Sequence, residues 1–66
     1  MCRNIKQLRR PEQEPTDEEL QAAALQFVRK ITGYRAPSRV NEAAFNQAVE
    51  AIAHASRELF EHLVTR

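Results

Sequence analysis

Residues 27–45, FVRKITGYRAPSRVNEAAF, hold the feature that most constrains the fold, a pair of helix breakers between two apolar helical patterns. Gly33 is the only glycine of the chain, and Pro37 is one of three prolines. Glycine readily adopts the left-handed conformation that ends a helix, and proline pushes the residue before it out of helical geometry. We therefore expect two helices separated by a turn within this stretch.

The apolar residues before Gly33 predict a helix over about 17–32. They recur three or four residues apart on one helical face, as Leu20, Ala23, Ala24, Phe27, Val28 and Ile31. Thr16 and Glu19 match the capping-box pattern, in which each side chain accepts a hydrogen bond from the other residue's backbone N–H. Acidic residues fill the first turn and basic residues the last, as the helix dipole favours. Gly33 is expected to cap the helix, with Tyr34 folded back onto Val28.

The segment after the turn predicts one long helix over about 42–64, because neither glycine nor proline occurs after Pro37. Its start can be read in two ways. If Ser38 is the N-cap, Arg39 lies inside the helix; if Asn41 is the N-cap, Val40 can pack on Phe45 as a hydrophobic staple. We favour the second reading.

A heptad-like seam runs along this second helix, with apolar positions alternately four and three residues apart. The seam consists of Phe45, Val49, Ile52, Ser56, Leu59 and Leu63. The helix would be about 35 Å long, against about 24 Å for the first. The surplus from Leu59 to Val64 must then be covered by Ile5 and Leu8 of the N-terminal arm, or by another copy of the chain.

These patterns predict an all-α fold, a two-helix antiparallel hairpin with an N-terminal arm that pairs into a dimeric four-helix bundle. Residues 1–66 would form one domain, with an arm and proline-bracketed linker over 1–15, the first helix and its cap over 16–33, and the second helix over 41–65. A chain of this length buries only about 60% of its unfolded surface. Cys2 is the only cysteine, so no intramolecular disulfide can add stability. Small domains of this kind usually gain stability by assembling, so we expect a homo-oligomer.

The start of the chain, MCRNIKQLRR, lacks the apolar run of a secretory signal, and no later segment is apolar over a membrane-spanning length. The single thiol suits a reducing compartment. We expect a cytoplasmic protein that does not contact a membrane.

A basic region at the junction is the first candidate binding site. Arg35, Ser38, Arg39 and Asn41 lie where the amides of a helix N-terminus could bind an anion. Together with the basic arm, which has four cations in residues 1–10, they could follow the phosphates of a nucleic acid. The turn is longer than the three or four residues of a helix-turn-helix, so nucleic acid is the less favoured partner.

Cys2 is the second candidate, for a metal or redox role. His54 and His62 lie roughly 12 Å apart along the second helix, which is too far to share a metal within one chain. We predict no catalytic residue, no cofactor and no enzymatic activity. The favoured function is a helical assembly or protein-binding module, with anion or nucleic-acid binding and Cys2 chemistry as the alternatives.

The segments MCRNIK, TDEELQAAALQFVRKITG, PS and NEAAFNQAVE extend over most of the chain. In these segments the sequence resembles a family of small bacterial proteins known only as a domain of unknown function. The resemblance implies a bacterial origin and a compact helical protein. It brings no established activity, substrate or catalytic residue.

Overall fold

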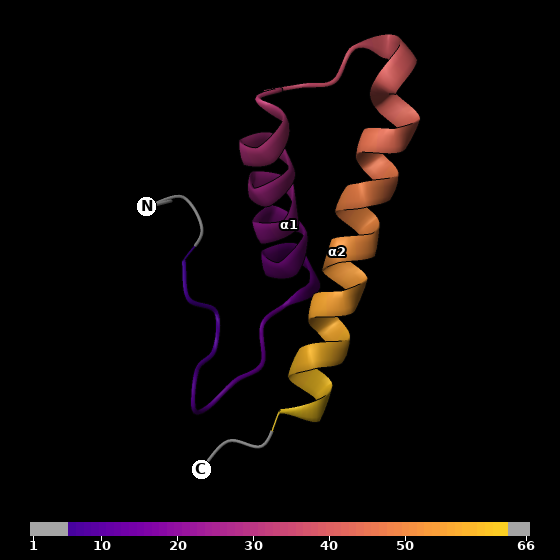
Figure 1. The fold of residues 1–66 in the computed structure, drawn as a ribbon. Coiled ribbons are helices and arrows are strands. Elements are labelled where there is room, and N and C mark those ends of the chain that lie inside the picture. Colours follow the sequence, from indigo (N-terminus) through magenta and orange to yellow (C-terminus); the bar gives the residue numbers. More distant parts are fainter. Residues whose placement is uncertain (1–5, 64–66) are drawn as a thin grey trace.

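A computed structural model describes residues 6–63, and in this range it contains helices and no strand. Helix α1 spans Asp17–Thr32, a short 3-10 helix η1 spans Arg39–Asn41, and helix α2 spans Glu42–His62. Figure 1 shows α1 and α2 packed side by side in opposite directions, with the connection between them at one end of the molecule. The predicted all-α fold with two main helices is confirmed.

Both ends of α1 follow from local sequence signals. The Thr16 hydroxyl accepts a hydrogen bond from the Glu19 N–H at 3.1 Å, and the Glu19 carboxylate accepts one from the Thr16 N–H at 2.8 Å. At the other end Gly33 adopts a left-handed conformation with φ 78°, and its N–H donates to the Arg29 carbonyl at 2.8 Å. The predicted capping box and glycine cap are confirmed.

Helix α2 begins at Glu42 with Asn41 in the N-cap position, as the favoured reading predicted, but η1 lies between the turn and the helix. Asn41 precedes α2 with φ −104° and ψ 2°, and its side chain makes no capping bond. An N-cap normally has extended backbone, which lets the preceding residue fold onto the helix. Here the chain enters α2 from a 3-10 turn, and Val40 is 87% exposed. The predicted staple between Val40 and Phe45 is therefore wrong.

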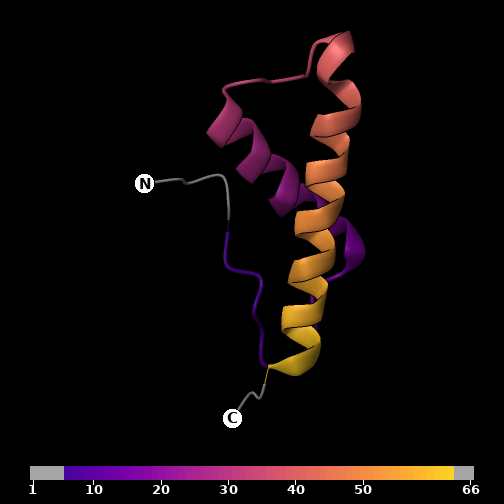
Figure 2. The same cartoon turned by 45° about the vertical axis from the view of Figure 1, so that its right-hand side comes forward.

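The core lies between one face of each helix. Its buried side chains are Ala24 and Val28 of α1 with Phe45, Val49 and Ala53 of α2. The buried α2 residues step by four, whereas the predicted seam stepped alternately by four and three. Steps of four are typical of helices that cross at an angle instead of supercoiling, and Figure 2 shows α1 inclined to α2. Ala53, which lies outside the predicted seam, is buried, while Leu59 of the seam is 55% exposed.

Helix α2 ends earlier than expected. Its last helical residue is His62, and Leu63 has an extended backbone with φ −72° and ψ 137°. Leu59 and Leu63 are both exposed, so little packing holds this last turn in place. The predicted helical boundary at 64 or 65 is thus too late, and residues 64–66 lie outside the described range.

The N-terminal arm, residues 6–15, runs beside the helices to a turn near the C-terminal end of α2 and then enters α1 (Figures 1 and 2). Leu8 is buried beside a hollow of α1 that Ala22 and Ala23 also line. The arm therefore covers a surface of α1 and leaves Leu59 exposed. Ile5, the other residue expected to cover the surplus of α2, lies outside the described range.

Two arginines attach the arm, residues 6–15, to the helices. Arg10 bonds both carboxylate oxygens of Glu19 at 2.9 Å. Arg57 of α2 donates to the Pro15 carbonyl at 2.7 Å and to the Asp17 carboxylate at 2.8 Å, and reaches Glu14 at 3.4 Å. Arg57 thus connects the start of α1 to the far end of α2.

Candidate functional site

The four residues of the predicted anion site lie close together in the chain but have different surroundings. The Asn41 side chain donates to the Ser38 hydroxyl at 3.1 Å and to the Tyr34 hydroxyl at 3.5 Å. These hydrogen bonds engage the polar side chains that lie next to the N-terminus of α2. Arg39 begins η1 and is exposed. Arg35 instead lines an open cleft beside Gly33.

This cleft has a volume of about 360 Å³, and Arg29, Lys30 and Arg35 supply its charge. Within residues 6–63, none of these three cations forms an ion pair. The cleft lies at the C-terminal end of α1, where the negative end of the helix dipole opposes an anion. Anion or nucleic-acid binding at the junction stays a prediction.

The residues considered for metal or redox chemistry have no shared site in the described part of the chain. Cys2 lies outside that part. His54 lies 3.5 Å from the Glu58 carboxylate, and His62 contacts the Glu58 carbonyl at 2.8 Å. No group of three His, Cys, Asp or Glu side chains that could hold a metal ion occurs among residues 6–63.

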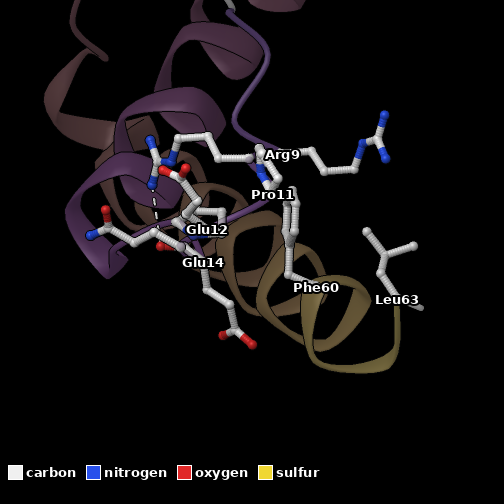
Figure 3. Close-up of a pocket in the computed structure, with 9 residues that line it drawn as sticks. Arg9, Pro11, Glu12, Glu14, Phe60 and Leu63 are labelled. Carbon is white, nitrogen blue, oxygen red and sulfur yellow. Dashed lines mark hydrogen bonds between the residues drawn. The ribbon is translucent and has the colours of Figure 1, made fainter. Parts of the chain in front are cut away.

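The contact of the arm with the end of α2 forms a hollow of about 210 Å³ (Figure 3). Pro11 and the Phe60 ring face each other there, while Arg9 and Leu63 point away from them. Phe60 is half-buried as a result. The arm therefore covers one apolar residue of the α2 surplus, on the side of the helix that also carries Arg57.

Electrostatics at the start of α1 favour the ionised form of one carboxyl group. The hydrogen bonds from Arg10, and then the one from the Thr16 N–H, lower the pKa of Glu19 from 4.5 to about 2. The same contact raises the pKa of Arg10. This pair is structural, because it fixes the arm and the helix cap together.

A partly exposed apolar face of α2 is a further candidate for binding. We call it the α2 stripe, and its residues recur at spacings of three or four along one side of the helix. The α2 stripe consists of Ala44, Ala48, Ile52, Ala55 and Leu59. Ala48 and Ile52 are half-buried, and the other three are exposed. None of its members is charged, although charged residues flank it on α2.

At the junction end, the α2 stripe borders a groove of about 340 Å³. Helix α1 supplies Val28 and Ile31, the turn supplies Tyr34, and α2 supplies Ala44, Phe45 and Ile52. Ile31 is 63% exposed, so the groove is open to a partner. Sequence reasoning found Ile52 and Leu59 as seam residues and missed the groove. The sequence feature that indicates the groove is the set of alanines on the same side of α2.

None of the helices in residues 6–63 has the length and apolarity needed to cross a membrane. Comparison with curated proteins and with solved structures found no similar protein. Comparison with protein families matched residues 1–66 to a family described as an uncharacterized conserved protein, DUF2277. This match agrees with the resemblance seen in the sequence and covers the whole chain. The chain therefore belongs to the DUF2277 family, whose function is unknown.

Proposed function

We propose that this protein is a non-enzymatic helical assembly module that forms a dimeric four-helix bundle with a second copy. The observation that carries the proposal is the α2 stripe together with its adjoining groove. Ala44, Ala55 and Leu59 of the stripe are exposed, and Ala48 and Ile52 are only partly covered by their packing against the core. The expected setting of the dimer is the bacterial cytoplasm.

The composition of the stripe suits helix-to-helix contact. Small side chains such as Ala44, Ala48 and Ala55 allow two helix axes to approach to the short end of the usual 8–10 Å. The larger side chains, Ile52 and Leu59, provide apolar area, and its burial is favourable by about 25 cal/mol of free energy per Å² removed from water. A neutral, alanine-rich face of this kind has no polar groups of its own to leave unpaired on docking.

The size of the chain gives a second reason for assembly. Helix α1 has 16 residues and α2 has 21, so α2 is longer by about 7.5 Å. Leu59 follows Arg57, whose side chain contacts the start of α1, and is 55% exposed. A domain of this size gains little stability from its own core, and pairing is a common way to gain more.

The experiment compares the mass of the wild-type protein with that of two aspartate variants by light scattering after size exclusion. Leu59→Asp places a charge in the stripe, whereas Gln47→Asp places the same charge at an exposed α2 position outside it. We expect wild type and Gln47→Asp to have twice the monomer mass of 7.6 kDa, and Leu59→Asp to be monomeric. A monomeric wild type at micromolar concentration overturns the proposal.

A further inference from the structure

Resting on the proposed dimer, we infer that its two copies pack antiparallel along α2, with each copy's Leu59 inserted into the partner's groove beside Tyr34. The inference specifies which surfaces meet and in which direction. It follows from two independent observations, the shape of the apolar face and the distribution of charge.

The apolar face has a protrusion at one end and a groove at the other. Leu59 is the large side chain at the C-terminal end of the α2 stripe and is 55% exposed. The groove lies at the N-terminal end of α2, between Ala44 and Ile31. A two-fold interface presents the same patch on both subunits, so a protrusion must meet a groove of the same patch. Only antiparallel α2 helices bring these two features together.

The two ends of the molecule carry opposite charge. The junction end, at the top of Figure 1, has four bases, Arg29, Lys30, Arg35 and Arg39, with Glu42 as its one acid. The opposite end contains the start of α1 and the last turns of α2. It has seven acids and three bases among residues 9–19 and 57–61.

This distribution determines the direction of packing. Antiparallel copies place the basic end of each subunit beside the acidic end of its partner, whereas parallel copies place like charges together. Like charges facing each other across an interface are unfavourable, and unlike charges favour docking. The four bases of the junction end have no carboxylate partner among residues 6–63. In the antiparallel dimer they face the partner's acidic end.

The spacing along α2 gives the register. If the partner's Leu59 lies over Ala44, residues whose numbers add to about the same total face each other across the two-fold axis. Ala48 then faces the partner's Ala55, and the axis passes close to Ile52. Alanine meets alanine on both sides of the axis, which permits close approach of the two helices.

Disulfide cross-linking between mixed variants tests this register. Both variants carry Cys2→Ser, so that each has one cysteine; one carries Ala44→Cys and the other Leu59→Cys. A disulfide needs Cα atoms about 4.4–6.8 Å apart. We expect oxidation of the mixture to give a cross-linked dimer, and oxidation of either variant alone to leave single chains. Gln47→Cys mixed with Leu59→Cys is the matched control and should not cross-link.

A second pair, Ala48→Cys with Ala55→Cys, leaves Leu59 in place and should also cross-link only when mixed. A cross-linked dimer formed by the Leu59→Cys variant without a second variant indicates parallel helices and overturns the inference. Dimers that cross-link in neither mixture overturn the register but leave the proposed assembly intact. A wild-type protein that is monomeric by light scattering overturns both.

Discussion

Replacement of Arg57 by methionine tests how the linker and α1 are attached to the far end of α2. The Arg57 side chain is 23% exposed and makes three contacts across a sequence separation of 40 or more residues. Its contact with the Pro15 carbonyl, at 2.7 Å, is a part-buried, charge-assisted hydrogen bond. Such a bond contributes about 1.5 kcal/mol, at the low end of its usual range because the site is partly open.

The two carboxylate contacts of Arg57 add less. The Asp17 side chain is 87% exposed, and the Glu14 side chain, 3.4 Å away, is 67% exposed. Ion pairs of this kind are each worth about 0–1 kcal/mol. Arg57→Met keeps most of the apolar stem, so the expected loss is about 1.5–2.5 kcal/mol in the free energy of unfolding. For a domain of this size, that corresponds to a fall of very roughly 10 °C in Tm.

Urea unfolding followed by circular dichroism measures this loss. All samples need the same protein concentration, because association stabilises the folded state by mass action. Gln47→Met is the control, since Gln47 is exposed on α2 and lies outside the α2 stripe; it should change stability by less than about 0.5 kcal/mol. If Arg57→Met loses no more stability than Gln47→Met, the Arg57 contacts do not hold the linker to α2.

Three further predictions concern the helix ends and the core. Gly33→Ala should cost about 1–2 kcal/mol by urea unfolding, because φ is 78° and the added Cβ meets nothing within 4 Å; an unchanged midpoint would contradict the cap. Glu19, with its pKa lowered from 4.5 to about 2, stabilises the fold above pH 4.5 and loses that effect as pH falls through about 2. The Tm difference between wild type and Glu19→Gln should therefore shrink over this window, and a constant difference would refute the link. Leu20→Ala, at a side chain only 3% exposed, should cost about 2–5 kcal/mol and lower the helical signal, whereas Val40→Ala should have little effect; equal effects would contradict the packing.

The sequence predicted α1 closely because its signals are local. Thr16, Glu19 and Gly33 act on their own backbone neighbours, so the boundaries follow from residues within one turn. The capping box depends on no contact with α2. The same reasoning gave the number of helices and the position of the turn, since one glycine and one proline separate the two apolar patterns.

The prediction failed where the outcome depends on how α1 and α2 cross. A heptad seam requires two helices that run nearly parallel along their whole length. Helix α1 is instead inclined to α2, so Ala53 is buried and Leu59 is left exposed. The Val40 staple failed because η1 changes the entry into α2. The groove beside Tyr34 likewise depends on the placement of the turn against α2, which no local pattern determines.

The exposed end of α2 was anticipated in one respect. The length difference between the helices indicated that Leu59 would need a further partner, and the described part of the arm does not provide it. The alanines that complete the stripe, Ala44, Ala48 and Ala55, lie outside the predicted seam. The buried positions of α2 are Phe45, Val49 and Ala53, so these alanines lie beside the core face.

Sedimentation equilibrium of the wild-type protein over a range of concentrations tests the central claim most directly. A reversible dimer gives an average mass that rises with concentration from the monomer value of 7.6 kDa to twice that value. We predict this rise, with the doubled mass reached at micromolar concentration. A mass of 7.6 kDa at every concentration would contradict the proposal that the α2 stripe joins two copies of the chain.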